Sequence, residues 1–379
     1  MLITNFLICV SFIFGCDAYA NRCSTDADCT LFRSCPEAIR FAAINQANDE
    51  KLKTSLCGTE IVDGKRLPKV CCSAFRMTDD RLGFLGDDSE PGPGADSAET
   101  HPNINLLPTK CGQIDGDRII GGVIANLWEF PWMALISHRT RAAPGKDNLQ
   151  FKCGGSIINS RYVMTAAHCV VNKKLAGVRV GEFDINSKED CQGEYPKIYC
   201  ERHIQDISIE ESIPHQGYER SPVNNDIALL RLKKPIDFSH KNVAPICLPV
   251  KSELRNVVLG GKSATVAGWG TTDTGYQSSV LRKVTIPILT ASGCRDMYNK
   301  NSDNGDTTLK KICAGELKKD SCSGDSGGPL MLESQIDGKF RMIQYGVVSY
   351  GPKQCGSLFP GVYTDVTAYI DWILDTIKA

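Results

Sequence analysis

A stretch near the C-terminus, KKDSCSGDSGGP at residues 318–329, surrounds one serine with small residues. Ser326 stands in the run GDSGGP, where small neighbours let backbone N–H groups converge on one point, as an oxyanion-binding site requires. A serine hydroxyl attacks a carbonyl efficiently when a base takes its proton and an acid orients that base. The run therefore predicts acyl-transfer chemistry if the rest of the chain supplies a base and an acid.

Two residues far upstream suit these roles. Of the six histidines, His168 in VMTAAHC is the one in an apolar, strand-like run beside a cysteine. Asp226 in NNDIALLRL enters a strongly apolar segment, where an unpaired carboxylate is costly and a histidine N–H is a good partner. A buried structural histidine is the ordinary interpretation of one such residue alone. Because the base and the acid both precede the serine, the chain order argues against an α/β-hydrolase, which runs serine, acid, histidine.

Composition excludes some classes of partner. The chain has 379 residues, a formal net charge of -1 and an isoelectric point near 6.6, so nothing indicates a nucleic-acid partner. Residues 1–20 hold an apolar run too short to span a bilayer and end in Ala-Tyr-Ala, which predicts a secretory signal peptide instead of a membrane anchor. No later segment is long and apolar enough to span. We therefore expect a secreted, extracellular protein.

Cysteine usage agrees with export. The chain has 18 cysteines, two of them in the signal peptide, so 18 minus 2 leaves 16. An even, high count in an exported chain predicts disulfides, and no pair of CxxC motifs favours zinc. Residues 21–72 form a small unit with six cysteines, whose pairing the spacing alone does not choose. Residues 73–118 are acidic and rich in Gly, Pro and Ser, which predicts a flexible linker.

Residues 119–379 make up the large domain. Short β-branched or aromatic runs recur between Gly, Asn, Asp and Pro clusters, a spacing that predicts an all-β barrel or sandwich. The end of the chain differs, because apolar residues there follow helical spacing and predict an amphipathic helix that packs on the β structure. These residues are Val366, Ile370, Ile373 and Ile377.

Five ordered motifs, RIIGG, TAAHC, DIALL, GDSGGP and PGVYT, resemble those of the chymotrypsin/trypsin family of serine proteases across residues 119–379. The six-cysteine unit, which ends in the adjacent pair Cys71-Cys72, resembles the clip domain of arthropod haemolymph proteases. The resemblance implies a mainly β fold: two six-stranded antiparallel barrels and a C-terminal helix, preceded by a disulfide-rich clip domain. It places the active site between the barrels.

The resemblance also implies a role for each candidate site residue, because the serine triad is best described in this family. His168 would be the base, Asp226 its orienting acid and Ser326 the nucleophile, with the N–H groups of Gly324 and Ser326 as the oxyanion hole. Asp320, six residues before the serine, would form the floor of the primary specificity pocket, kept open by Gly351 and Gly361. A carboxylate there implies cleavage after Arg or Lys.

The resemblance also implies a zymogen. Cleavage between Arg118 and Ile119 would free an ammonium that pairs with Asp325. The activator would be a similar trypsin-like protease, since Arg118 is itself a trypsin-type site, and a serpin is the expected class of inhibitor.

Family matching implies a full set of disulfides. In the clip unit it gives Cys23–Cys71, Cys29–Cys57 and Cys35–Cys72. In the large domain it gives Cys153–Cys169, Cys294–Cys313 and Cys322–Cys355, and it joins Cys111 of the preceding segment to Cys247. It leaves Cys191 and Cys200, which most simply bridge each other. The Cys111–Cys247 bond would tether the clip unit to the catalytic domain after activation.

One acidic loop, GEFDINSKEDC, resembles the calcium loop of some trypsins and clip proteases. Glu182 and Asp190 would supply carboxylates and Asp184 and Ser187 backbone carbonyls, oxygen ligands that suit calcium. Acidic surface loops usually bind nothing specific, so a solvated loop is the alternative. No cofactor is expected for catalysis itself.

Taken together, these features predict a secreted clip-domain serine endopeptidase that acts on protein substrates in an extracellular proteolytic cascade. Such cascades activate prophenoloxidase for melanisation, process the Toll ligand precursor or serve embryonic patterning. The alternatives are a non-catalytic clip-domain homologue acting as a cofactor and a digestive trypsin. The presence of Ser326, His168 and Asp226 argues against the first, and the clip unit and linker argue against the second.

Overall fold

The computed structural model describes residues 23, 28–31, 35, 54–62, 65–75, 98–114, 123–141, 147–272, 276–298, 310–315, 324–351 and 360–379. The chain divides into two compact units, Met1–Glu90 and Pro91–Ala379. The signal peptide expected at residues 1–20 lies outside the described residues.

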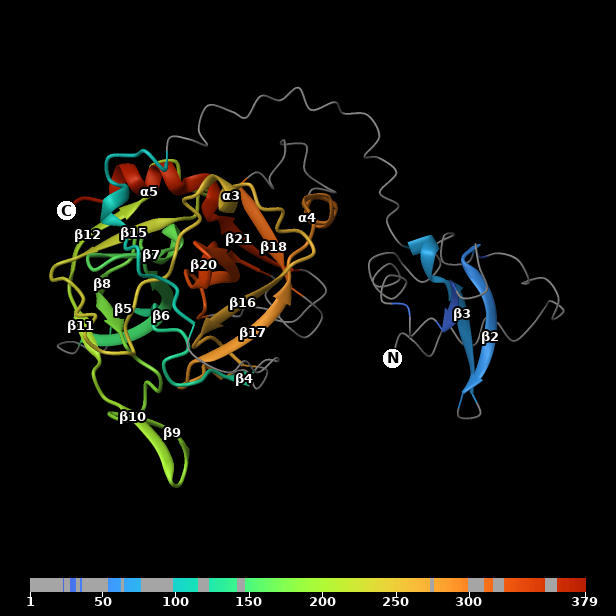
Figure 1. Cartoon of the computed structure of the whole chain (residues 1–379), viewed down its shortest axis with the longest axis horizontal. Helices are drawn as coiled ribbons and strands as arrows, with labels where there is room; N and C mark the ends of the chain where they lie inside the picture. The colour runs from blue at the N-terminus through green and yellow to red at the C-terminus, as the bar shows by residue number, and fades with distance from the viewer. Residues whose placement is uncertain are drawn as a thin grey trace. The chain divides into compact units, whose positions relative to one another are not determined.

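The first unit contains a small antiparallel sheet with the strand order β1-β3-β2 (Figure 1). Its elements are β1 (Cys29–Leu31), β2 (Leu56–Val62), β3 (Lys65–Cys71) and the 3₁₀ turn η3 (Cys72–Phe75). Three disulfides hold it, with the pairing that the clip resemblance implied: Cys23–Cys71, Cys29–Cys57 and Cys35–Cys72. A unit this small buries little apolar surface, so these bonds supply much of its stability.

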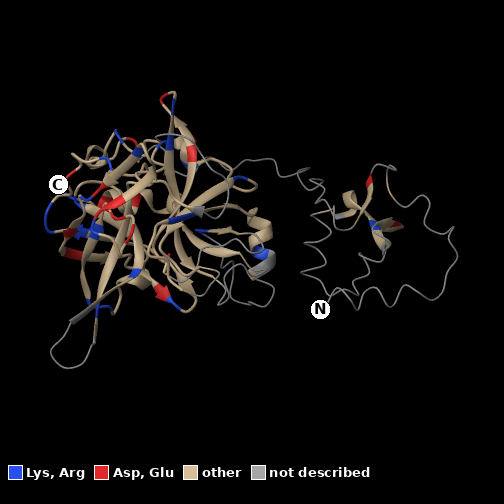
Figure 2. Ribbon diagram, turned by 90° about the horizontal axis from the view of Figure 1, so that it is seen from below, with Lys and Arg blue, Asp and Glu red and all other residues tan. Residues whose placement is uncertain are grey.

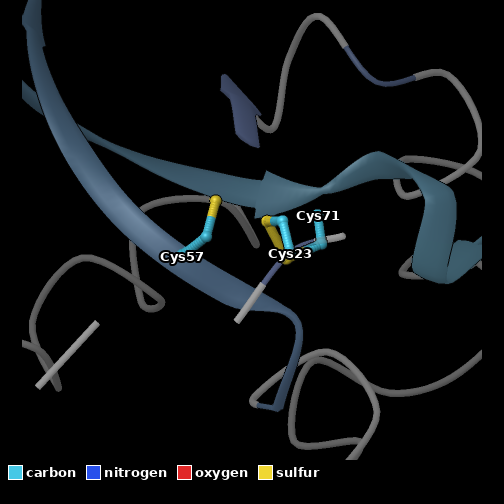
Figure 3. A group of neighbouring side chains, drawn as sticks. All are labelled: Cys23, Cys57 and Cys71. Carbon is cyan, nitrogen blue, oxygen red and sulfur yellow. A yellow bond between two sulfur atoms is a disulfide. The ribbon is translucent and has the colours of Figure 1, made fainter. Parts of the chain in front are cut away.

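The sulfur atoms of Cys23, Cys57 and Cys71 lie close together, within 4.8 Å of one another (Figure 3). Such a group resembles a set of zinc ligands, but zinc binds thiolates. Cys23 is bonded to Cys71 and Cys57 to Cys29, so the group is part of the disulfide framework.

The first large sheet has the order β11-β8-β5-β6-β7-β15-β12. Its strands are β5 (Met133–Arg141), β6 (Asp147–Ile157), β7 (Tyr162–Thr165), β8 (Leu175–Val180), β11 (Gln205–Ile207), β12 (Ile209–Pro214) and β15 (Ala228–Leu232). Only Ser208 separates β11 from β12, although the two lie at opposite ends of this order. They are therefore one interrupted strand that pairs with β8 on one side and β15 on the other, which closes a six-stranded barrel.

The second large sheet has the order β18-β21-β20-β19-β16-β17-β4. Its strands are β16 (Ser263–Gly268), β17 (Arg282–Pro287), β18 (Lys311–Ala314), β19 (Pro329–Ile336), β20 (Lys339–Tyr350), β21 (Gly361–Asp365) and the short addition β4 (Val123–Ile124). A bridge between Ile288 and Ala314 joins the segment after β17 to the end of β18 and closes six strands. The prediction of two six-stranded antiparallel barrels is confirmed.

The remaining elements are short. They are η4 (Ile104–Leu106), η5 (Ala167–Cys169), β9 (Asp190–Glu194), β10 (Lys197–Glu201), β13 (Glu219–Arg220), β14 (Val223–Asn224), α3 (Ser252–Arg255), α4 (Ala291–Tyr298), η6 (Val366–Tyr369) and α5 (Ile370–Thr376). β9 and β10 form a two-stranded hairpin that projects from the barrels (Figure 1).

The C-terminal helix is confirmed. It begins as η6 and continues as α5, and the four residues that carried the helical spacing are all buried. Val366, Ile370, Ile373 and Ile377 join the core cluster of the first barrel, which also contains Trp132, Tyr162 and Leu229. The apolar stripe of this helix is therefore a packing surface.

The segment before the barrels departs in part from the flexible linker expected over residues 73–118. Residues 76–97 and 115–118 lie outside the described residues, but residues 98–114 lie against the large domain. The side-chain amide of Asn103 donates to the carbonyl oxygens of Leu374 and Ile377, at 2.9 and 3.2 Å, and His101 lies 3.0 Å from Asp375. The physical reason is a short set of apolar residues, which the average composition of residues 73–118 conceals. They pack against the core: Ile104, Leu106, Leu107 and Ile114.

Acidic and basic residues are interspersed along the described ribbon of the large unit (Figure 2), in keeping with the formal net charge of -1. Within the described residues, every helix is too short or too polar to cross a membrane.

Candidate active site

His168 lies in η5, the turn that follows β7, and two hydrogen bonds join it to Asp226. Its backbone N–H donates to Asp226 Oδ1 at 2.9 Å, and its ring Nδ1 lies 2.8 Å from Asp226 Oδ2. The side chain of Asp226 is 2% exposed whereas that of His168 is 31% exposed. The buried acid thus fixes the orientation of an imidazole that solvent and substrate can reach.

Two further residues hold Asp226. The hydroxyl of Ser349 donates to Asp226 Oδ2 at 2.5 Å, and the hydroxyl of Thr364 donates to the Asp226 backbone carbonyl at 2.8 Å. A buried carboxylate needs such donors, because its desolvation is otherwise uncompensated. Sequence reasoning missed both residues, and their only signal was a hydroxyl within an apolar strand of the second barrel.

Ser326 lies across the interface between the two barrels from His168. Both residues lie beside the Cys153–Cys169 disulfide. Cys169 Sγ is 3.6 Å from His168 Nε2 and 3.6 Å from the Ser326 carbonyl oxygen. The backbone N–H of Gly154, on β6, donates to that carbonyl oxygen at 2.8 Å. Among the described residues no hydrogen bond joins the Ser326 hydroxyl to the imidazole. Catalytic hydrogen bonds are often long before substrate binds, so the absence of this bond is compatible with a triad.

Two glycines near Ser326 adopt positive φ values. Gly327 has a φ of +81°, and a Cβ there would overlap Thr165 Oγ1 and lie 2.6 Å from the Gly154 carbonyl oxygen. Only glycine therefore lets the second barrel approach the first at this point. Gly324 has a φ of +105°. Within the described residues, the N–H groups of Gly324 and Ser326 donate to no partner, and their role as the oxyanion hole stays a prediction.

A buried carboxylate, an oriented imidazole and a nearby serine form a set suited to nucleophilic attack on a carbonyl carbon. The comparison with known proteins agrees. The model of the "Trypsin" family matches residues 119–373. The chain belongs to the trypsin family.

Full-length relatives extend this to the clip-domain serine proteases. The chain is 36% identical over 388 residues to the "CLIP domain-containing serine protease HP8" of Bombyx mori, covering 98% of this chain and 96% of that protein. It is 36% identical to "Melanization protease 1" of Drosophila melanogaster, covering 93% and 90%. The crystal structure of the Drosophila Grass clip serine protease of the Toll pathway matches with a TM-score of 0.61 at 30% identity, covering 92% and 93%. The protein is a clip-domain, trypsin-like serine protease.

The specificity pocket of this clip-domain protease is described only in part. Asp320 lies outside the described residues. Gly351 directly follows β20 and is exposed, and Gly361 is the buried first residue of β21, where it pairs with Ala314. The role of Asp320 stays a prediction.

The carboxylate of Asp325 lies next to the end of β16 in the second barrel of the protease. Its Oδ1 accepts a hydrogen bond from the Gly270 N–H at 2.8 Å. A Cβ at Gly268 or Gly270 would overlap the Asp325 carboxylate, so both glycines leave room for it. Arg118 and Ile119 lie outside the described residues, and the expected pairing of the Ile119 ammonium with Asp325 stays a prediction.

Four disulfides of the protease domain lie in the described residues, and each is a pair that the resemblance or the remaining cysteines implied: Cys111–Cys247, Cys153–Cys169, Cys191–Cys200 and Cys294–Cys313. Cys322 and Cys355 lie outside them. Cys153 and Cys169 also stand close to His168, but their mutual bond removes the thiolates that a metal would need.

The loop expected to bind calcium contains two buried carboxylates. Glu182 Oε1 and Asp190 Oδ2 both accept from the Phe183 N–H, at 2.9 and 3.2 Å. Burial raises the pKa of Glu182 and of Asp190, and for Glu182 the charge of Asp190 adds to the effect. Asp190 Oδ1 is buried without a hydrogen-bond partner, whereas Glu182 Oε2 lies 3.1 Å from Arg179. The orphaned Asp190 oxygen therefore fits a cation, and Arg179 already neutralises part of the charge.

The other two expected ligands form a local turn. The Ser187 N–H donates to the Asp184 carbonyl oxygen at 2.8 Å, and the Ser187 hydroxyl donates to the Glu189 carbonyl at 2.7 Å. A carbonyl oxygen has two lone pairs, so this bond still permits the Asp184 carbonyl to coordinate an ion.

Proposed function

We propose that this protein is a secreted serine endopeptidase, made as a zymogen, that cleaves protein substrates after Arg or Lys in an extracellular proteolytic cascade. The observation that carries the proposal is the pair of hydrogen bonds between His168 and Asp226 beside the Ser326 loop. A non-catalytic homologue would not need this arrangement with its serine intact.

In the proposed mechanism, His168 Nε2 takes the proton of the Ser326 hydroxyl as its oxygen attacks the peptide carbonyl, and the peptide C–N bond then breaks as His168 returns the proton to the leaving amine. Asp226 stabilises the imidazolium that forms. The N–H groups of Gly324 and Ser326 would bind the oxyanion, a contribution of about 3 kcal/mol for each donor. Water then hydrolyses the acyl-enzyme by the same route.

Specificity and activation follow from two carboxylates. Asp320 would pair with the arginine or lysine side chain of the substrate. Asp325 would pair with the ammonium of Ile119 after cleavage at Arg118. This ion pair would order the loop that carries the N–H groups of Gly324 and Ser326. The Cys111–Cys247 bond would keep the N-terminal part attached after that cleavage.

The cascade is proposed from the relatives. Relatives that are similar over most of this chain include "Melanization protease 1" and the "Spaetzle-processing enzyme" of Drosophila melanogaster, the second at 38% identity. We therefore propose a role in melanisation, Toll signalling or patterning. Its partners would be an upstream trypsin-like protease and a serpin inhibitor.

A structural calcium ion is a further part of the proposal. Glu182, Asp190 and the Asp184 and Ser187 carbonyls would hold it, and its charge would offset the repulsion between the two buried carboxylates. Calorimetry with Ca²⁺ on wild type and on Asp190→Asn tests this. The absence of binding by wild type at millimolar Ca²⁺ would remove calcium from the account.

The peptidase proposal is tested with the purified full-length chain before and after cleavage at Arg118 by an added trypsin-like protease. The substrates are fluorogenic peptide amides that end in Arg, Lys or Leu. We expect hydrolysis of the Arg and Lys amides only after cleavage, a loss of at least about 10⁴-fold in Ser326→Ala, and no change in Ser212→Ala, an exposed strand serine. A chain that is cut at Arg118 and hydrolyses no amide would contradict the proposal. Asp320→Ser tests the pocket, because unchanged cleavage after Arg would refute its assignment.

A further inference from the structure

A lysine without an assigned role stands beside the buried acid of the triad. Lys311 begins β18 and, with Val223, Asp226 and Ser349, lines a small cavity. Its ammonium lies over the ring of Tyr350, 5.7 Å from the ring centroid. Tyr350 directly follows Ser349, whose hydroxyl holds Asp226. The lysine therefore lies next to the candidate active site.

The charge of Lys311 has no ion-pair partner among the described residues. Burial lowers the pKa of Lys311, and the nearby Asp226 carboxylate opposes that shift in part. Among the described residues the Tyr350 ring is the partner of this ammonium. Its charge is incompletely compensated there, since a cation–π contact contributes less than a close carboxylate. An acidic group brought by a ligand would complete the site.

The strand that carries Tyr350 offers a place for an extended peptide. β20 pairs with β19 as far as Val347. Two further bonds follow: the Val348 N–H donates to the Gly328 carbonyl and the Gly327 N–H donates to the Val348 carbonyl, both at 2.9 Å. Beyond Val348, the described residues of this strand pair only with β21 on the opposite edge, through Tyr350 and Val362. An extended substrate can add to the open edge as another strand, which brings some of its side chains over Tyr350 and Lys311.

We propose that Lys311 is a specificity-determining residue that binds an acidic side chain of the substrate on the N-terminal side of the scissile bond, with Tyr350 as the platform for its ammonium. This inference rests on the proposed peptidase function and names a substrate class for it. The activation segment of the chain itself belongs to that class. Its sequence before the expected cleavage is Ile-Asp-Gly-Asp-Arg, so Asp117 and Asp115 are the second and fourth residues before the bond. A second copy of this zymogen is therefore a matched substrate.

The test uses the full chain cleaved at Arg118 and four fluorogenic peptide amides. One has the sequence Ile-Asp-Gly-Asp-Arg, two replace one Asp by Asn, and the fourth replaces both. We expect kcat/KM for the best acidic peptide to exceed that of the double-Asn peptide by about 10-fold at low salt, and the ratio to approach 1 in 1 M NaCl. The single replacements identify the position that Lys311 contacts.

Two variants separate recognition from support of the triad. In Lys311→Met the acidic-to-neutral ratio should fall to about 1, while in Lys339→Met, an exposed lysine at the start of β20, it should stay at the wild-type value. Lys311→Gln provides the same readout if the methionine variant does not fold. Lys311→Glu should favour a peptide with Lys in place of the contacted Asp.

The outcomes are distinct. Hydrolysis of none of the peptides would overturn the peptidase function and the inference with it. Hydrolysis with a wild-type ratio near 1 would overturn only the inference. A Lys311→Met enzyme that is slower on all four peptides with an unchanged ratio would show that the lysine merely supports Asp226, and would also overturn it.

Discussion

The N–H of Gly154 donates to the carbonyl oxygen of Ser326 at 2.8 Å, so a bond between the two barrels ends at the residue proposed as nucleophile. Gly154 lies on β6 of the first barrel, and Ser326 precedes β19 of the second. His168 and Asp226 belong to the first barrel, while Ser349, the donor to Asp226, belongs to the second. The geometry of the site therefore depends on how closely the barrels meet.

Gly327 controls that approach. Gly327→Ala should lower the free energy of unfolding by about 3 kcal/mol or more, because it adds an overlap with Thr165 Oγ1 to an unfavourable positive φ. The matched control is Gly338→Ala, whose φ of +75° is similar but whose Cβ would meet nothing within 4 Å. It should cost only about 1 kcal/mol. Denaturant unfolding measures both, and equal losses in the two variants would show that the barrel contact is not tight.

Ser349 should contribute to catalysis through Asp226. Ser349→Ala removes a hydrogen bond to a buried carboxylate, worth about 1.5–3 kcal/mol, so kcat/KM should fall by about 10- to 100-fold. Thr364→Val removes a bond to the backbone carbonyl of the same residue and should cost less than about 5-fold. Steady-state kinetics on an Arg amide compare the two. A larger effect from Thr364→Val would mean that the position of the Asp226 backbone matters more than its charge.

Asn103 should anchor the segment before the proposed activation site at Arg118 to the C-terminal helix. Asn103→Ala removes two hydrogen bonds to carbonyl oxygens at the end of α5 and should destabilise the large unit by about 1–2 kcal/mol. Asn105→Ala, two residues away and exposed, should change stability by less than about 0.5 kcal/mol. Thermal unfolding of the uncleaved chain measures the difference. If Asn103→Ala were as stable as wild type, the amide bonds would be dispensable and the apolar contacts alone would hold the segment.

Tyr369 should make the fold sensitive to alkaline pH. Burial raises the pKa of Tyr369 to about 12, with added repulsion from Asp365 and Asp226. Because this folded-state pKa exceeds the unfolded value of about 10, the associated stability is present below pH 10 and is lost as the pH rises toward 12. The full difference is about 3 kcal/mol.

Tyr369→Phe loses the hydrogen bond to Asn225 at every pH, about 1 kcal/mol, but its stability should fall less steeply than that of wild type between pH 9 and 11. Tyr195→Phe, at a residue that is 90% exposed, should keep the wild-type slope. Urea unfolding at several pH values provides the measurement. If the free energy of unfolding fell equally steeply with pH in all three proteins, groups other than Tyr369 would cause the loss of stability at alkaline pH.

The sequence alone determined the family and the class of fold and indicated the chemistry. The motifs around Ser326, His168 and Asp226 have a recognisable order, and the apolar spacing of Val366 to Ile377 predicted a buried helix face, because local patterns record which side of an element is covered. The pairing of the described cysteines was also available: by resemblance for all but Cys191 and Cys200, which remained when the others had been assigned.

Only the tertiary structure decided the rest. Ser349 and Thr364 lie more than a hundred residues from Asp226, and Lys311 approaches the same acid from a third strand, so no local spacing could indicate these contacts. Residues 98–114 were expected to be flexible because the average composition of residues 73–118 conceals a short apolar run. That run becomes buried only when the barrel core is present. Sequence patterns encode local periodicity and residue chemistry, whereas the closeness of two barrels depends on packing between segments far apart in the chain.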